Sequence, residues 1–565
     1  MVLGEGFGER AWYRHPWPTH HRDGSNSDRS PLVVSPDVRI QNYVLGGNAV
    51  LTAPVIDAQG RWFVTTGKNQ WQGNLHAFNR EGRRLWSQGA MDSLAVTGTP
   101  ILDEGGRLYA GDGRFLRALD PADGRIVWQA TIPAPLVTPV LLSGNRVGGI
   151  TVNGDVVVVD RDTGANRAAP LRIGGPGPEA PARFPGLWAG LMDPAIIDTV
   201  FAGLVGFDVV IANTPAVHPR GDRMFILAGN GVLYGLDVGG AAVSVRFATT
   251  LGEGSGTSPA LSPDGGVVYA GDGAGWLYAV DGSSGAVRWR VFTGPSFASP
   301  SVDGAGRVLV QAGSRIVVVS PVGQVLWARD YSWLASQTLG SRWIDGVRVD
   351  ADLQFVSALT LAANAILVQA DLGFPVERPP ARRLILPVQS VLLFLDLQTG
   401  LPLAAPVSLP DSGGGVVSLD DAGRIYVPHG ALLTSVAESV LTPGQRAVLG
   451  LLSPVGGVTV LEPRVPRQVY DANVSAAVAA ITMAERALVD GDVSGATEAT
   501  LAAQALVRAV SSLQAGGLPG RTLPAGRLAL SVVILDRVER MLDAPGPEGL
   551  RRARQGLLLT RFLLR

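Results

Sequence analysis

The chain has 565 residues, of which 47 are basic and 48 acidic, so its net charge is −1. A charge this balanced creates no long-range field that would attract a polyanion, and we expect no nucleic-acid partner. The absence of cysteine excludes disulfides, thiolate metal sites and cysteine nucleophiles. With 46% hydrophobic residues and 72 glycines, the composition indicates a large core whose segments are joined by many tight turns.

The N-terminal segment contains no secretory signal as it stands, because Met1 to Phe7 lack a basic stretch followed by an apolar core. Either the protein is cytoplasmic or a signal has been removed. Further on, His20, His21 and Asp23 form a small polar cluster. We expect a flexible surface lead-in there rather than a metal site.

A repeat of about 40 residues runs along most of the chain. Units begin at pairs such as Thr99-Pro100 and Ser258-Pro259 and continue as a short apolar strand, a glycine turn and a second strand. Pairs such as Asp112-Gly113 are typical of hairpin turns, since both residues tolerate positive φ. This period is the one expected for a β-propeller blade of four short strands.

The end of the unit is its most specific part. Residues 118–128 and 279–289 share the pattern A-x-D-x-x-x-G-x-x-x-W. We expect the Asp and Gly to close a β-turn, and the Trp to lie flat between adjacent blades and bury about 150–250 Å². The predicted blade-docking residues are Trp86, Trp128, Trp289 and Trp327.

This pattern resembles the tryptophan-docking repeat of the quinoprotein (PQQ) alcohol dehydrogenase-like β-propeller superfamily, which includes PQQ-like and BamB-like repeat proteins. The segment 17–32 is similar to the lead-in of that superfamily, and the resemblance covers about residues 11–450. It implies an all-β propeller of eight blades, or of seven because the last two units are degenerate, with the last blade completed by an N-terminal strand. The expected units are 52–96, 97–135, 136–172, 214–255, 256–296, 297–330, 357–411 and 414–462.

We therefore predict a propeller domain over residues 1–463 and a C-terminal α-helical bundle over 464–565. The second begins where strand alternation gives way to alanine-rich helical periodicity. Three insertions interrupt the propeller, and insertions in such a ring protrude from its faces, where binding is usually built. They are residues 173–213, 331–356 and 371–390.

Aromatic residues in two of these insertions are candidate partner contacts. Trp188 and Phe201 belong to an apolar set at near-helical spacing, which favours either a short lid helix or an exposed protein or membrane contact. Trp333 and Trp343 stand near Asp345, Asp350 and Asp352, which favours either a packed long loop or a groove for a sugar or small ligand.

Membrane contact is expected to be peripheral at most. The longest apolar stretch lies within 187–207 and is interrupted by Asp193, Pro194 and Asp198, so we expect no transmembrane span. Residues 550–565 combine leucines with arginines. Such a segment is either a last helix packed by its leucines or an amphipathic end that adsorbs on an anionic membrane or a partner.

The resemblance leaves two functions open. One is a quinoprotein dehydrogenase acting on alcohols or sugars, with PQQ and calcium in the central funnel. Enzymes of that kind commonly place a vicinal cysteine pair over the cofactor, and this chain has no cysteine. No residue here aligns with a calcium ligand or base, and the general catalytic motifs are absent.

The sequence therefore favours the second function, a non-catalytic binding or scaffolding propeller. We expect it to present loops to a protein or polysaccharide partner. The resemblance implies a location in the periplasm or at the cell surface. No catalytic or metal-binding residue and no cofactor are predicted.

Overall fold

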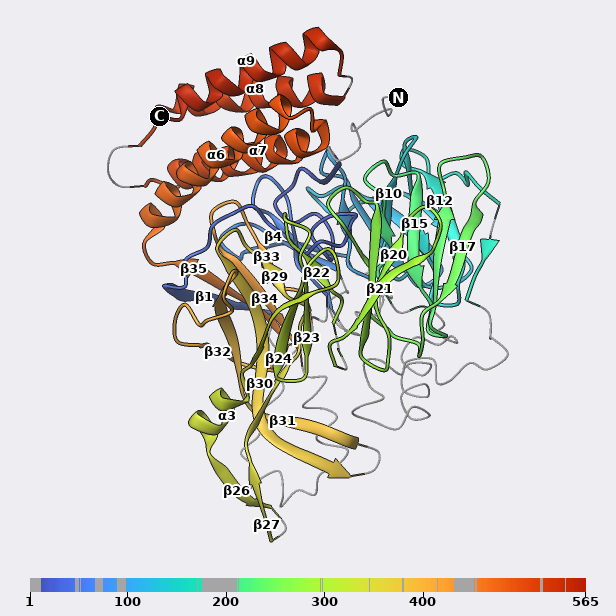
Figure 1. Cartoon of the computed structure of the whole chain (residues 1–565), viewed down its shortest axis with the longest axis vertical. Helices are drawn as coiled ribbons and strands as arrows, with labels where there is room; N and C mark the ends of the chain where they lie inside the picture. Colours follow the sequence, from blue (N-terminus) through green and yellow to red (C-terminus); the bar gives the residue numbers. More distant parts are fainter. Residues whose placement is uncertain are drawn as a thin grey trace.

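The computed structural model describes most of the chain as a ring of β-sheets with a group of helices at one end (Figure 1). The described residues are 12–565 apart from 46–49, 51, 67–74, 89–97, 170, 175–210, 212, 295, 297, 345, 379–380, 414, 431–451, 453–454, 519–521 and 544.

The first three blades are four-stranded antiparallel sheets with their strands in chain order. Blade 1 contains β2 (Val55–Ile56), β3 (Trp62–Thr65), β4 (Leu75–Phe78) and β5 (Arg84–Gln88); blade 2 contains β6 (Ile101–Leu102), β7 (Leu108–Asp112), β8 (Phe115–Leu119) and β9 (Ile126–Thr131); blade 3 contains β10 (Val140–Leu142), β11 (Arg146–Ile150), β12 (Asp155–Asp160) and β13 (Leu171–Arg172).

Blades 4 to 6 repeat the same arrangement. Blade 4 contains β14 (Ala216–Val217), β15 (Arg223–Leu227), β16 (Val232–Asp237) and β17 (Ser244–Thr250); blade 5 contains β18 (Ala260–Leu261), β19 (Val267–Gly271), β20 (Trp276–Asp281) and β21 (Val287–Phe292); blade 6 contains β22 (Ser301–Val302), β23 (Val308–Ala312), β24 (Arg315–Val319) and β25 (Val325–Asp330).

Blades 7 and 8 depart from this plan. Blade 7 has five strands, β28 (Asp352–Phe355), β29 (Thr360–Leu361), β30 (Ala365–Arg378), β31 (Ala381–Asp396) and β32 (Val407–Leu409). Blade 8 joins β33 (Ser418–Leu419), β34 (Ile425–His429) and β35 (Gly457–Pro463) to the N-terminal strand β1 (Val38–Val44). Eight blades, the last completed by an N-terminal strand, are thus confirmed, and the seven-bladed alternative is excluded.

Between blades 6 and 7 lie a short helix α3 (Ser332–Leu339) and a separate hairpin of β26 (Ser341–Ile344) and β27 (Val347–Asp350). After β35 the chain is helical. The four C-terminal helices are α6 (Pro466–Val489), α7 (Val493–Ala515), α8 (Ala525–Asp543) and α9 (Pro547–Leu563). Figure 1 shows them over one end of the ring, with α3 and the hairpin at the other end. The expected C-terminal helices are therefore present, four in number among the described residues.

The core of the ring lies between blades, because each sheet is covered on both faces by its neighbours. Phe63 of blade 1, for example, shares a buried cluster with Leu108 of blade 2. The four predicted docking tryptophans lie at these contacts. Trp128 donates its indole N–H to the carbonyl of Arg161 in the next blade at 2.8 Å, and its ring covers Gly164.

The sequence pattern has a steric explanation. Ala118 is the cross-strand partner of Trp128, so a small side chain leaves room for the ring. Gly164 has φ of +72°, and a Cβ there would lie 2.6 Å from the ring. The same geometry recurs at the other docking tryptophans: Trp86 covers Gly124, Trp289 covers Gly323, and Trp327 covers Gly400.

Blade 4 uses a phenylalanine that the sequence analysis missed. Phe247 covers Gly285 of blade 5, where a Cβ would lie 2.6 Å from the ring, and its cross-strand partner is Gly235. Phe247 stands two residues further from Asp237 than Trp128 does from Asp120, so the pattern A-x-D-x-x-x-G-x-x-x-W does not match this unit. The signal that could have found it is an aromatic residue near the end of every unit, with the spacing left free.

A glycine-to-alanine pair tests whether these rings join the blades. Gly313 also has positive φ (+61°), but a Cβ there meets nothing within 4 Å, whereas a Cβ at Gly164 meets Trp128. Both substitutions carry the cost of a left-handed alanine, about 1–2 kcal/mol. Only Gly164→Ala displaces the ring, so we expect it to lower the free energy of unfolding by a further ~1–3 kcal/mol in guanidinium titrations. Equal losses for the two variants would show that the ring contact adds nothing.

Candidate functional site

The insertion between blades 6 and 7 forms an arm, here defined as α3, β26 and β27. We expected a packed long loop or a groove at this insertion, and the structure instead has a helix followed by a hairpin. Its inner side is anchored, since Ala335 is fully buried and Ile344 and Val349 pack against the largest hydrophobic cluster. The Arg342 guanidinium also lies 5.0 Å from the centre of the Phe374 ring in blade 7.

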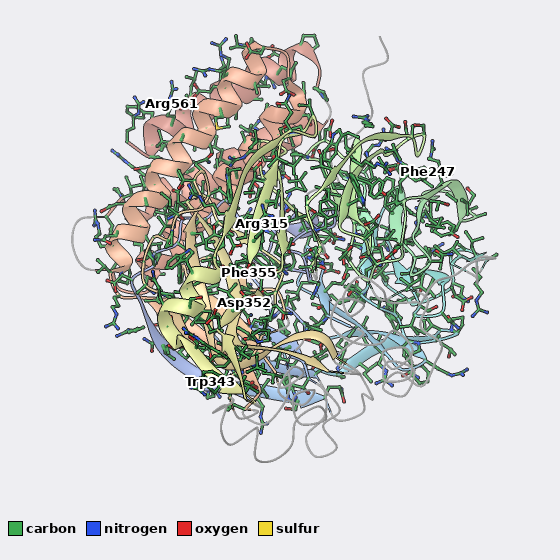
Figure 2. All side chains as sticks on the ribbon, turned by 60° about the horizontal axis from the view of Figure 1, so that its bottom comes forward. Phe247, Arg315, Trp343, Asp352, Phe355 and Arg561 are labelled. Atoms are coloured by element: carbon green, nitrogen blue, oxygen red, sulfur yellow. The ribbon has the colours of Figure 1, made fainter. Side chains whose placement is uncertain are left out.

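The outer side of the arm carries the two predicted aromatic contacts. Trp343 is 70% exposed and Trp333 is 44% exposed. In the hairpin Trp343 stands opposite Arg348, whose guanidinium donates to the hydroxyl of Ser341 at 2.9 Å. Figure 2 places Trp343 at the outer end of the arm, on the side of the view opposite Arg561 of α9. The arm thus presents an aromatic and a cationic side chain on a folded support.

The other predicted contacts are placed only in part. Trp188, Phe201 and the stretch 187–207 lie outside the described residues. Of the C-terminal segment 550–565, α9 buries Leu557 against the other helices while Phe562 is 70% exposed. In the described part of the chain, α6 alone is long and apolar enough to cross a membrane by length and composition. Its face bearing Ile481 packs within the helical cluster.

The lead-in is not a flexible surface segment, and the structure corrects that expectation. His21 is buried and His20 is half-buried, because residues 17–30 hydrogen-bond to the first strands of the blades. Backbone bonds join the lead-in to six blades: Ile56 in blade 1, Leu102 in blade 2, Val217 in blade 4, Leu261 in blade 5, Val302 in blade 6 and Leu361 in blade 7. The polar residues of the lead-in predicted a segment exposed to solvent, but residues of the ring serve as their hydrogen-bond partners.

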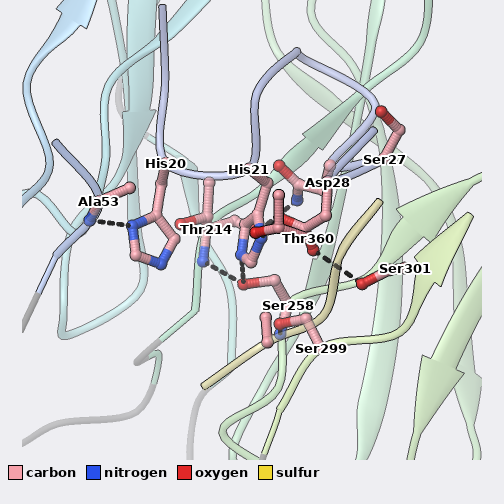
Figure 3. A network of polar contacts seen from close by, with 12 residues as sticks. His20, His21, Ser27, Asp28, Ala53, Thr214, Ser258, Ser299, Ser301 and Thr360 are labelled. Carbon is pink, nitrogen blue, oxygen red and sulfur yellow. Dashed lines mark hydrogen bonds and ion pairs between the residues drawn. The ribbon is translucent and has the colours of Figure 1, made fainter. Parts of the chain in front are cut away.

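His21 lies at the centre of this polar network (Figure 3). Its Nδ1 is 2.8 Å from an oxygen of Asp28, and its Nε2 is 3.1 Å from the hydroxyl of Ser258. Ser258 Oγ also accepts the backbone N–H of Thr214 at 2.9 Å. The second Asp28 oxygen is 3.1 Å from the hydroxyl of Ser301.

The contacts run from Ser258 through His21 to Asp28, as in a Ser–His–Asp catalytic triad. The surroundings of these side chains favour a structural role. All three are buried, and Ser258 lines neither of the two cavities beside the lead-in. Burial raises the pKa of the Asp28 carboxyl, while His21 and Ser301 act in the opposite direction. The network ties the lead-in to blades 5 and 6.

Removing His21 tests this assignment. His21→Ala leaves the Asp28 carboxylate buried without its main partner, and loss of one member of a buried pair costs about 3–5 kcal/mol. We expect a loss of that size in the free energy of unfolding. The double variant His21→Ala/Asp28→Asn removes the charge as well, so it should recover part of the loss. A double variant less stable than the single one would contradict the assignment.

Asp371 of β30 is a buried carboxylate with a strongly raised pKa. It is fully buried; one oxygen accepts the hydroxyl of Ser412 at 2.6 Å, and the other has no hydrogen-bond partner. Burial raises its pKa to about 7, and the Ser412 bond lowers the value. A group of this kind is a candidate functional acid or base, although structural carboxylates show the same shift.

The residues around Asp371 do not fit a calcium-bound quinone. The nearby Asp411 carboxylate accepts backbone N–H groups from Ser412, Val455 and Gly456, so its oxygens are already engaged. Within the described ranges, no group of three or more His, Asp or Glu side chains is placed to hold a metal ion.

The raised pKa of Asp371 predicts a pH effect on stability. The carboxyl of Asp371 keeps its proton up to about pH 7 in the folded state but only to about pH 4 in the unfolded state. Protonated Asp371 therefore stabilises the fold fully below pH 4, and this stabilisation is lost as the pH rises towards 7. Asp371→Asn removes this pH dependence. Between pH 4 and 8 the free energy of unfolding of wild type should therefore fall by up to about 4 kcal/mol relative to that of the variant. The opposite contribution of His429, whose pKa burial lowers to about 4, is common to both proteins.

Denaturant titrations of wild type and Asp371→Asn at several pH values measure this difference. Parallel curves of stability against pH would show that Asp371 titrates normally.

Comparisons with known proteins identify the repeat. The family model described as outer membrane protein assembly factor BamB matches residues 46–189 and 229–354. No curated protein matches the chain in sequence.

Two solved structures are similar to the chain at low identity. A europium-containing methanol dehydrogenase is 10% identical, with a TM-score of 0.56 over 80% of this chain and 98% of its own. The crystal structure of BamB from Moraxella catarrhalis is 14% identical, with a TM-score of 0.44 over 75% of this chain and 100% of its own. The eight blades show a β-propeller fold, which the methanol dehydrogenase shares, and the family-model match supports PQQ-like repeats over the two matched ranges.

Proposed function

We propose that the chain is a non-catalytic binding propeller that presents the arm to a protein partner at the cell envelope. The observation that carries the proposal is Trp343, which is 70% exposed on a hairpin that belongs to no blade. A large aromatic side chain in water is costly, and residues of this kind mark contact surfaces.

The chemistry of the arm favours a protein. Tryptophan and arginine dominate the binding energy of protein interfaces, and Trp343 stands directly opposite Arg348 in the hairpin. Val347, 62% exposed at the turn end of the same hairpin, adds apolar surface. The anchored inner side keeps these residues in place, so little entropy is lost when a partner binds.

The matched family adds support for the partner class and the location. Its description is an outer membrane protein assembly factor, which is a role exercised through other proteins at the envelope. We carry over the class of partner and the compartment, and no particular partner. A polysaccharide is the other occupant that the aromatic residues would suit.

Truncation of Trp343 tests the proposal. In quantitative co-purification from envelope fractions, we expect Trp343→Ala to lose a partner that wild type retains. A hot-spot tryptophan is worth about 2 kcal/mol or more, so the affinity for that partner should fall on the order of 30-fold. Val322→Ala is the matched control, since Val322 is 71% exposed but lies in a blade turn away from the arm.

Two outcomes would contradict the proposal. In the first, wild type and Trp343→Ala recover every protein partner equally, and binding to a glycan array depends on the arm. This result would make the ligand a polysaccharide. The other is a rise in melting temperature with bound chromophore when PQQ and Ca²⁺ are added. A cofactor at 100 times its Kd would stabilise the fold by about 2.7 kcal/mol and favour the dehydrogenase alternative.

A further inference from the structure

A cavity of about 190 Å³ lies between the lead-in and α7, at the end of the ring opposite the arm. A second cavity of about 240 Å³ shares Arg14, Arg22 and Arg508 with it. Arginines outnumber acids in the wall of the first. Its charged lining consists of Arg14, Arg22, Arg29, Arg508, Asp23 and Glu498.

Both acids in this wall are already engaged. One oxygen of Asp23 accepts the backbone N–H groups of Ser25 and Ser27, at 3.0 and 3.1 Å, and the other accepts the Ser27 hydroxyl at 2.6 Å. Glu498 of α7 pairs with Arg29 at 2.6 Å. Hydrogen bonds or an ion pair therefore engage both carboxylates, and the charge of Asp23 raises the pKa of the neighbouring Arg22.

The other arginines of the wall also have carboxylate partners. Arg14 lies 3.2 Å from Glu539 of α8, and Arg508 lies 3.2 Å from Asp536 of the same helix. Arg22 differs from them. Among the described residues no carboxylate lies within ion-pair distance of its guanidinium.

Among the described residues, the guanidinium of Arg22 makes one weak hydrogen bond, a 3.4 Å contact to the carbonyl of Tyr13. Its Nε is buried without a partner. Burial lowers its pKa, which reflects the cost of holding this charge away from water. The backbone of Arg22 has φ of +74°, a conformation that is strained for a residue with a side chain. The structure thus holds a strained, half-buried guanidinium, with a buried and unpartnered Nε, against a cavity.

We propose that this cavity binds a small oxyanion of the charge and size of inorganic phosphate, held by Arg22. A guanidinium presents its N–H groups as a planar fork that matches the oxygens of such an anion. The volume is below the range of about 300–1,000 Å³ typical of pockets for larger organic ligands. Because Arg508 of α7 lines the same cavity, the bound anion bridges the lead-in and the helices.

The test is a phosphate titration of the full-length protein at constant ionic strength, with sodium chloride as the compensating salt. We expect the melting temperature of wild type to rise with phosphate and to saturate, because a ligand of the folded state stabilises it by mass action. Arg22→Gln should lose the rise. Arg125→Gln, which removes an exposed arginine of blade 2, should keep it.

Isothermal titration calorimetry with phosphate gives the second measurement. We expect at least a tenfold weaker affinity in Arg22→Gln and a smaller loss in Arg508→Gln, whose arginine remains engaged by Asp536. If Arg22→Gln does not fold, Arg22→Lys keeps the charge without the fork and should also bind more weakly. The absence of a phosphate-specific rise in wild type, or an equal rise in wild type and the Arg22 variants, would overturn the proposal.

Discussion

The pairing of β1 with β35 is the contact on which the rest of the structure depends. The two strands run antiparallel from Val38 opposite Pro463 to Val44 opposite Val458, and they join the two ends of the ring. β35 then has no free edge, because β1 becomes the terminal strand of the blade 8 sheet. The closure also fixes where the adjoining segments begin. The N–H of Arg464 bonds the carbonyl of Asp37 at 2.9 Å, so the helices start beside the end of the lead-in.

The ring could be predicted because its information is local and repeated. An alanine opposite a tryptophan, an aspartate that caps a turn and a glycine under the ring all fall within one unit of sequence. Asp160 illustrates the turn, since it accepts the N–H groups of Asp162 and Thr163. The neighbouring Arg167 guanidinium lowers its pKa to about 2, so the carboxylate stays ionised. Where the local spacing changed, as at Phe247, the same contact was made but the prediction failed.

The candidate sites could not be predicted in the same way, because their partners are distant in sequence. His21 and Ser258 are 237 positions apart, with the strands of four blades between them in the sequence. Polar residues in a short N-terminal segment predicted exposure, and no local pattern indicated that the ring would satisfy them. The arm is an intermediate case. Trp343 was identified by residue type, but its exposure depends on how the hairpin pairs and anchors.

The polar character of the buried lead-in follows from its position. Isolated β-bridges join the lead-in to the ring at Trp17 and Arg29, and its other buried polar groups need partners of their own. Asn26 shows the solution, since its side-chain amide donates to the carbonyls of Thr214 and Pro259 in blades 4 and 5. An apolar plug would bury as much surface but would leave such carbonyls unpaired. We infer that the network fixes one position of the lead-in around the ring, and with it the side chains that line the cavity under α7.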